Sequence, residues 1–289
     1  MSNNTPSILN PQSSILMLSC GSFQFDLSRP LVMGIVNVTP DSFSDGGRHS
    51  GRESAIAHAL KLLEEGADIV DIGGESTRPG ASPVSLQEEL DRVLPVIEGL
   101  HGAAVSIDTF KPDVMMQAIA LGVCMVNDIN ALQDAAAMSV VADSQVAVCL
   151  MHKQGDPQTM QLQPGYGNVV DEVAAFLRAR IVAAQLAGIT RERIVIDPGF
   201  GFGKTLEHNL ALLRELEKLT LPGVPVLAGL SRKSMLGALT GQNAQQRMPG
   251  SIAAALIAVQ RGAKIVRVHD VRETVDALKI WNAINGDMQ

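Results

Sequence analysis

The sequence has no surplus of basic residues. Its 289 residues carry a formal net charge of −7, so it lacks the clustered positive charge that binding to nucleic acid or an anionic membrane surface requires. It also lacks any apolar run near the ~20 residues that a membrane-spanning helix needs, and it begins without the basic and apolar regions of a secretory signal. Because the net charge is negative, any anionic ligand must be held by a local cluster of groups. Residues 1–14 are expected to be a disordered tail.

Cysteine is scarce. Cys20, Cys124 and Cys149 form no C-x-x-C motif, and the latter two lie inside apolar runs. Free thiols in such runs usually pack as small hydrophobic side chains. This pattern predicts a reduced, cytoplasmic protein.

Common catalytic signatures are also missing. The sequence contains no G-x-S-x-G, no G-x-x-x-x-G-K-[ST] and no H-E-x-x-H motif. The segment GFGFGK at 199–204 lacks the spacing of a dinucleotide-binding loop and is expected to form a tight turn. Covalent catalysis is therefore not expected, and positioning and electrostatics must accelerate any reaction.

What the sequence does contain is a regular alternation of short β-branched runs and amphipathic helical stretches, from residue 31 almost to the end. The alternation recurs about eight times, which predicts a (β/α)8 TIM barrel of parallel strands. The preceding stretch ILMLSCGSFQFDLS predicts a β-hairpin around Gly21 and Ser22 that covers the barrel floor. No linker-like composition interrupts the chain, so residues 15–289 are expected to form a single domain.

Two helices have specific patterns. ESAIAHALKLLEEG, from residue 53, is expected to end at Gly66, with Ile56, Ala59, Leu60 and Leu63 on one face. A second helix is expected to begin at Ser85, which has Glu88 at the spacing of a capping box.

In a barrel of this kind, the active site lies at the carboxyl ends of the strands. Each expected strand delivers a polar group there: Asn37, Asp71, Asp108, Asn127, His152, Asp197, Arg232 with Lys233, and Arg267 with His269. A helix cap or a bonded strand end explains any one of them, but the whole set predicts a binding site.

The chemistry of these groups suggests a ligand. Aspartates in apolar strands are costly to bury without donors, and a flat heterocycle with a ring N–H beside an exocyclic amine offers a carboxylate two parallel donors. Arg267 and His269 come just before a helix, where a guanidinium and backbone N–H groups favour a phosphate. The residues therefore predict a pocket for a planar heterocycle beside a phosphate.

Several segments, in this order and spacing, resemble the dihydropteroate synthase family: MGIVNVTPDSFSDGG, DIGGESTRPGA, SIDTFKP, VNDI, CLMH, DPGFGFGK, SRKSMLG and RVHDV. The likeness covers roughly residues 15–285 and implies a pterin-binding barrel. The family joins 7,8-dihydropterin-6-ylmethyl diphosphate to 4-aminobenzoate, which releases diphosphate and gives dihydropteroate for folate synthesis.

The resemblance also implies roles for individual residues. Asp197 would hold the amidine edge of the pterin, with Asn127 and Lys233 on its other polar atoms and Asp108 against the ring. The residues implied for the diphosphate are Thr77, Arg78, Arg267 and His269. Asn37 is implied as the side chain that helps to hold a Mg²⁺ ion.

For 4-aminobenzoate, the resemblance implies a slot bounded by Phe43, Pro79, Phe202 and the stem of Lys233, with Ser234 at its carboxylate. Asp45, positioned by Arg78, is the candidate proton acceptor after the amine attacks, and Asp108 would stabilise the pterin cation. Relatives are commonly homodimers. The helix SIAAALIAV either supplies such an interface or packs against the barrel.

Two other functional hypotheses remain open at this point. A pterin-binding module that presents a methylated pterin to a corrinoid partner protein would need the pterin pocket but not NVTPDSFSDGG, STRPG or SRKS, which are present. A non-catalytic barrel used as a scaffold would be expected to have lost residues of the rim set, and the set is intact.

Overall fold

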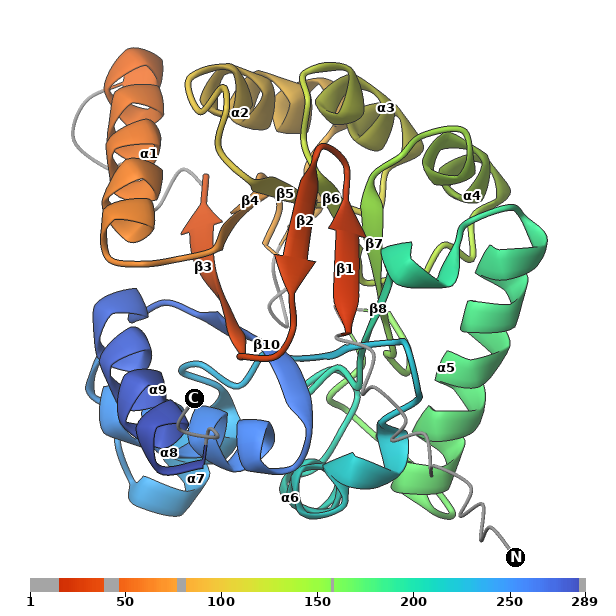
Figure 1. Cartoon of the computed structure of the whole chain (residues 1–289), viewed down its shortest axis with the longest axis vertical. Coiled ribbons are helices and arrows are strands. Elements are labelled where there is room, and N and C mark those ends of the chain that lie inside the picture. Colours follow the sequence, from red (N-terminus) through yellow and green to blue (C-terminus); the bar gives the residue numbers. More distant parts are fainter. Residues whose placement is uncertain (1–15, 39–46, 77–81, 157–158, 286–289) are drawn as a thin grey trace, which may run out of the picture.

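The computed structural model describes residues 16–38, 47–76, 82–156 and 159–285. Within these residues, parallel strands close into a barrel in the order β10-β3-β4-β5-β6-β7-β8-β9, and helices surround it (Figure 1). The predicted (β/α)8 fold is confirmed. The strands are β3 (Leu31–Asn37), β4 (Ile69–Gly73), β5 (Val105–Asp108), β6 (Met125–Asp128), β7 (Ala147–Met151), β8 (Ile194–Asp197), β9 (Val226–Ala228) and β10 (Ala263–Val268).

Helices connect consecutive strands over the outside of the barrel, with two of them, α7 and α8, between β9 and β10. The helices are α1 (Gly47–Glu64), α2 (Leu86–Glu98), α3 (Pro112–Ala120), α4 (Ala135–Ala142), α5 (Val169–Leu186), α6 (Leu206–Arg214), α7 (Ser234–Thr240), α8 (Met248–Gln260) and α9 (Val271–Asn285). Short 3-10 helices, η2 (Arg191–Arg193), η3 (Leu216–Leu219) and η4 (Ala244–Gln246), lie in the loops. Ser85 caps α2 as predicted, since its side chain accepts a hydrogen bond from the N–H of Glu88.

The buried face of α1 differs from the prediction. Ala59 is buried and Ile56 and Leu63 pack against the core as predicted, but Leu60 is 45% exposed, and Ala55 and Leu62 are buried in addition. Leu62 packs over Gly34 of β3, where an added Cβ would lie 3.0 Å from its Cδ1 atom. This close approach of helix and strand selects the stripe that contains Leu62, and the sequence pattern alone did not reveal it.

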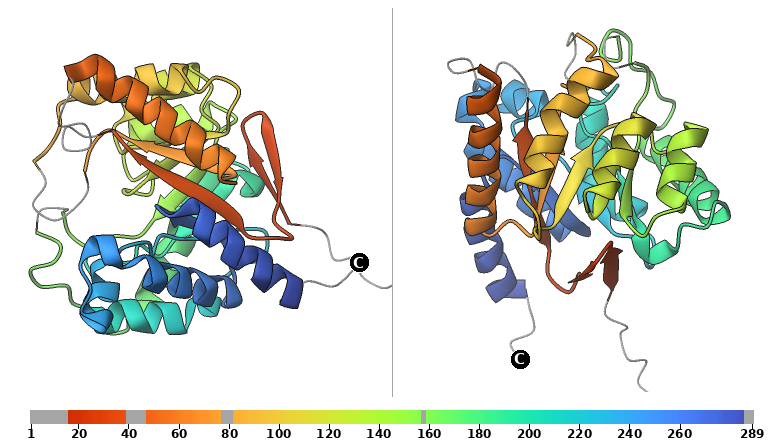
Figure 2. Two further views of the ribbon diagram at one scale, coloured as in Figure 1. Left: turned by 90° about the vertical axis from the view of Figure 1, so that its left-hand side faces the viewer. Right: turned by 90° about the horizontal axis from the view of Figure 1, so that it is seen from above.

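The hairpin predicted at the barrel floor is present as β1 (Met17–Cys20) and β2 (Phe23–Asp26). It lies at one end of the barrel (Figure 2). There the N–H of Gly21 donates to the carbonyl of Gln145, and the Sγ of Cys20 lies 3.2 Å from the carbonyl oxygen of Cys124. The hairpin thus packs against the amino ends of the strands and leaves the carboxyl ends for a ligand.

The cysteines of the chain, Cys20, Cys124 and Cys149, are free and buried, and the burial of Cys124 and Cys149 was predicted. No helix in the described part of the chain combines the length and apolar character needed to cross a membrane.

Candidate active site

The predicted polar side chains lie at the carboxyl end of the barrel, on neighbouring strands. Asp108 ends β5, and in the parallel register it pairs with Gly73 of β4 and Asn127 of β6. Asp197 ends β8, and Arg267 is the last residue but one of β10. The closed strand order therefore places these groups around one mouth.

Arg267 lies at the centre of this group. Its Nε donates to Oδ2 of Asp71 at 2.6 Å, and its Nη2 donates to Oδ2 of Asp108 at 2.7 Å. Asn127 also donates to Oδ2 of Asp71, at 3.0 Å. Asp71 is fully buried, and its Oδ1 has no hydrogen-bond partner among the described residues. The mouth therefore holds one guanidinium between two carboxylates, with one carboxylate oxygen unsatisfied.

The surroundings shift the pKa values of Asp108 and Arg267 away from their ordinary values. Burial raises the pKa of Asp108 to about 7, against the lowering effect of Arg267, and the negative charge of Asp71 adds to the rise. Burial lowers the pKa of Arg267, but the charges of Asp71 and Asp108 outweigh this effect and raise the pKa above its ordinary value. Arg267 thus remains charged, while Asp108 titrates close to neutral pH.

Asp197 is held by the glycine-rich loop that follows β8. Its Oδ1 accepts a hydrogen bond of 2.7 Å from the N–H of Gly199. Gly199 has a φ of +67°, and an added Cβ would lie 1.9 Å from the carbonyl oxygen of His152, so only glycine fits there. The predicted tight turn is confirmed. Burial raises the pKa of Asp197, while the Gly199 N–H and the charge of Lys233 lower it.

Two further predicted residues follow β9. The ammonium of Lys233 lies 4.3 Å from the ring centroid of Phe202, at cation–π distance. Ser234 is the first residue of α7 and is exposed. Arg232, in contrast, pairs with Asp270, with 3.1 Å between its Nε and the carboxylate Oδ2.

His269 follows β10 and lies against Ser231. Its Nδ1 is 2.9 Å from the Ser231 hydroxyl, which also accepts the backbone N–H of His269 at 3.2 Å. Ser231 thereby fixes the orientation of the imidazole ring. The remaining predicted site residues, Phe43, Asp45, Thr77, Arg78 and Pro79, lie outside the described residues, and their roles stay predictions.

Three residues that organise this site had no individual role assigned from the sequence, although Asp71 was among the predicted rim groups. Asp71 holds Arg267 and Asn127, Ser231 holds His269, and Lys204 is buried beneath the glycine-rich loop. Asp71 gave a signal, because it is an aspartate within the apolar strand IVDIG, as Asp108 and Asp197 are within theirs. No sequence signal identified Ser231 or Lys204, apart from their positions in SRKSMLG and DPGFGFGK.

The predicted metal ligand Asn37 is the last residue of β3 and is exposed at the rim. Among the described residues, no group of three or more His, Cys, Asp and Glu side chains is arranged to hold a metal ion. A single amide oxygen nevertheless fits Mg²⁺, since this ion takes most of its ligands from phosphate oxygens and water.

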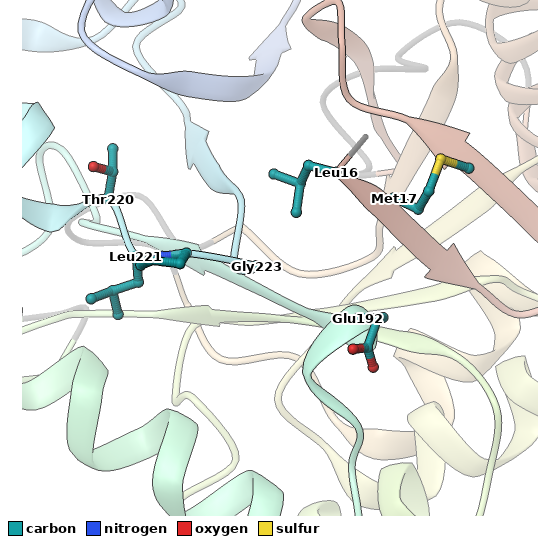
Figure 3. Close-up of a pocket in the computed structure, with 7 residues that line it drawn as sticks. Leu16, Met17, Glu192, Thr220, Leu221 and Gly223 are labelled. Atoms are coloured by element: carbon teal, nitrogen blue, oxygen red, sulfur yellow. The ribbon is translucent and has the colours of Figure 1, made fainter. Parts of the chain in front are cut away.

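A separate pocket of about 540 Å³ lies at the other end of the barrel (Figure 3). Leu16 and Met17 line it beside Glu192, together with residues 220–223, which precede β9. It contains none of the predicted site residues, so we assign the reaction to the carboxyl end.

Comparison with known proteins shows to which family the chain belongs. The family described as "Pterin binding enzyme" matches residues 33–269. A dihydropteroate synthase of Neisseria meningitidis serogroup B is 53% identical over 273 residues, which cover 91% of this chain and 96% of that protein. The chain belongs to the dihydropteroate synthase family. Members of this family are transferases of folate biosynthesis.

Solved structures extend the similarity to the fold. The structure of Xanthomonas albilineans dihydropteroate synthase with 4-aminobenzoic acid has a TM-score of 0.89 and 55% identity, and the match covers 94% of this chain and 99% of that chain. The Burkholderia cenocepacia enzyme complexed with 7,8-dihydropteroate has a TM-score of 0.85 and 49% identity, covering 93% of this chain and 96% of that chain.

Proposed function

We propose that the chain condenses 6-hydroxymethyl-7,8-dihydropterin diphosphate with 4-aminobenzoate to give 7,8-dihydropteroate and diphosphate. The observation that carries this proposal is the meeting of Asp197, Asn127, Asp108 and Arg267 at one barrel mouth. The similar structures with 4-aminobenzoic acid and 7,8-dihydropteroate support the choice of substrates.

The pterin would bind between the buried polar groups. Asp197 would accept the ring N–H and the exocyclic amine, and Asn127 and Lys233 would meet the other polar atoms. Asp197 already accepts a hydrogen bond from Gly199, which fixes the plane of its carboxylate before a ligand arrives. Such preorganisation reduces the entropy that binding must overcome.

The diphosphate would bind at the adjoining rim. The hydrogen bonds to Asp71 and Asp108 use two of the five N–H donors of the Arg267 guanidinium, so the other donors can face an anion. His269 lies at the same rim, since it comes two residues after Arg267 and directly after the end of β10. Thr77 and Arg78 complete the proposed set. Asn37 would hold a Mg²⁺ ion, which when bound neutralises part of the diphosphate charge.

The chemical step then requires no covalent enzyme intermediate. The bond between the exocyclic methylene and the diphosphate oxygen breaks, and its electron pair leaves with the diphosphate, where Arg267 and His269 would stabilise the growing charge. Asp108, when ionised, would stabilise the cation left on the pterin methylene. The amine nitrogen of 4-aminobenzoate then attacks that carbon, and its surplus proton passes to Asp45.

The acceptor slot would lie beside Lys233 and Phe202, whose ammonium and ring are already in contact. Phe43 and Pro79 would form its other walls, and Ser234 at the start of α7 would meet the carboxylate. Arg78 would position Asp45 toward the amine. This arrangement sets the aromatic acceptor next to the pterin methylene.

A cytoplasmic location and a homodimer belong to the same proposal. The free, buried cysteines support a reducing compartment. The Ala-rich face of α8 is buried within the single chain, so we assign the dimer contact to apolar side chains that stay exposed on α7, α8 and α9: Leu239, Ile257, Ile280 and Ile284. Light scattering of the purified chain would give twice the monomer mass if the chain is a homodimer.

The decisive experiment measures diphosphate release and dihydropteroate formation from the dihydropterin diphosphate, with and without 4-aminobenzoate. The proposal predicts that both products form in equal amounts and that dihydropteroate requires the amine. Absence of dihydropteroate in a folded preparation supplied with Mg²⁺ and both substrates would overturn it.

A further inference from the structure

Lys204 ends the glycine-rich loop and is only 3% exposed. Its ammonium nitrogen lies 2.9 Å from the carbonyl oxygen of Gly199, 3.0 Å from that of Phe202 and 3.3 Å from that of His152. The Nδ1 atom of His152 lies 3.0 Å away. Within the described residues, this buried cation is thus held by carbonyl groups and an imidazole rather than by a carboxylate.

Two of these carbonyls belong to the residues that hold Asp197. The N–H of Gly199 donates to the Asp197 carboxylate at 2.7 Å, and the N–H of His152 donates to the Asp197 backbone carbonyl at 3.0 Å. Each residue therefore faces Asp197 with its N–H and Lys204 with its carbonyl. These hydrogen bonds, which are charge-assisted when Lys204 is protonated, restrict the backbone of both residues, and through it the carboxylate.

The third carbonyl connects Lys204 to the other side of the loop. Phe202 accepts from Lys204 with its carbonyl, while its ring lies 4.3 Å from the ammonium of Lys233. Lys233 also packs on Gly201, where an added Cβ would lie 3.3 Å from the lysine Cδ. One buried ammonium thus fixes the loop on which both Asp197 and Lys233 rest.

We propose that Lys204 is a positioning residue for pterin recognition, which sets the Asp197 carboxylate and the Phe202 ring without touching the substrate. The inference rests on the proposed function, because it takes Asp197 as the pterin-binding carboxylate. It assigns the lysine of GFGFGK a task in specificity, beyond closing a tight turn.

The charges around Lys204 are consistent with this task. Burial lowers the pKa of Lys204 to about 7, Asp197 raises it and Lys233 lowers it. Burial also lowers the pKa of His152 to about 3, so the imidazole is neutral at pH 7. The rings of Tyr166 and His208 are in contact with each other, and the Tyr166 hydroxyl donates to the carbonyl of Gly203, next to Lys204. Asp197 is thus the negative charge that acts on this amine.

The chain offers a matched control in Arg193. It is also a buried cation bonded to carbonyl groups, those of Val146 and Val141, but it lies in η2, before β8 begins, at the opposite end of the barrel. Arg193→Met should destabilise the fold and leave pterin affinity unchanged.

The test compares Lys204→Met with Arg193→Met by urea unfolding and by calorimetry with 6-hydroxymethylpterin. We expect Lys204→Met to bind the pterin roughly 10- to 100-fold more weakly and to raise the KM for the dihydropterin diphosphate more than it lowers kcat. Lys204→Gln keeps two N–H donors, so its pterin affinity should lie between those of the parent chain and Lys204→Met. It replaces Lys204→Met in the test if the Met variant does not fold.

A double-mutant cycle separates positioning from general destabilisation. The losses of pterin-binding free energy caused by Lys204→Met and Asp197→Asn should be far less than additive, because both substitutions act through the same carboxylate. Additive losses, or unchanged pterin affinity in a folded Lys204 variant, would overturn the inference. Unchanged affinity in Asp197→Asn would instead overturn the proposed pterin pocket itself.

Discussion

The Nε atom of Arg267 lies 2.6 Å from Oδ2 of Asp71, and the same oxygen accepts the side-chain N–H of Asn127. Asp71 is fully buried, so it acts through the side chains that it holds and not at the surface of the barrel mouth. One carboxylate therefore orients two side chains that we propose as substrate contacts.

Asp71→Asn should reduce both stability and turnover. The change replaces a charged acceptor by a neutral amide and leaves Asp108 as the carboxylate, within the described part of the chain, that pairs with Arg267. We expect this to lower the free energy of unfolding by about 1–3 kcal/mol. It should also lower kcat/KM at least about tenfold, because Arg267 loses its fixed orientation. Urea unfolding and steady-state kinetics measure the two effects.

A suitable control for this variant is Asp276→Asn, which removes the exposed partner of Lys279. Exposed ion pairs contribute about 0–1 kcal/mol, so stability and kinetics should stay close to those of the parent chain. Equal behaviour of the two variants would show that Asp71 does not organise the site.

Asp197→Asn should severely weaken pterin binding. The amide would present a donor to a donor, and disrupting a buried charged hydrogen-bonded pair costs about 2–5 kcal/mol. Calorimetry with a pterin that lacks the diphosphate measures this loss. A loss of less than about tenfold would remove Asp197 from the pocket.

Arg267→Ala and His269→Ala should impair turnover more than they impair binding of a pterin alcohol. Both side chains are proposed to act on the leaving diphosphate, where charge grows as the bond breaks. Parallel calorimetry and single-turnover kinetics compare the two effects. Equal losses of affinity and turnover in both variants would assign these residues to ground-state binding of the pterin.

The pH dependence of activity should follow Asp108, whose pKa is raised to about 7 mainly by burial. The ionised form stabilises the pterin cation, so kcat/KM should rise with pH up to about 7 and then level off. Stability should move the other way. Because the folded pKa lies above the ordinary value of 3.8, the contribution of Asp108 to stability is present at low pH and is lost as pH rises through about 7.

Asp71→Asn offers a check on this assignment. The negative charge of Asp71 raises the pKa of Asp108, so its removal should shift the rising limb of the kcat/KM profile to lower pH. A limb that stays in place would assign the titration to another group.

The barrel and the composition of its rim could be predicted from the sequence alone. The period of apolar residues distinguishes strand from helix, and the regular alternation of the two leaves few topologies other than parallel strands with outer helices. Once parallel strands are specified, their carboxyl ends must lie together, so residues such as Asp108 and Asp197 could be assigned to one face without coordinates.

The contacts among these groups, in contrast, depend on the folded arrangement of the strands. Arg267 and Asp71 are 196 positions apart, and they meet because β10 closes the barrel against β3, which sets Arg267 one strand from β4. The same holds for Leu62, which is buried because Gly34 leaves room for it, and for Lys204, whose partners include His152, the residue that follows the neighbouring strand β7. Sequence period specifies which face a side chain takes along its own element, whereas contacts between elements depend on register, closure and local space, which no single segment encodes.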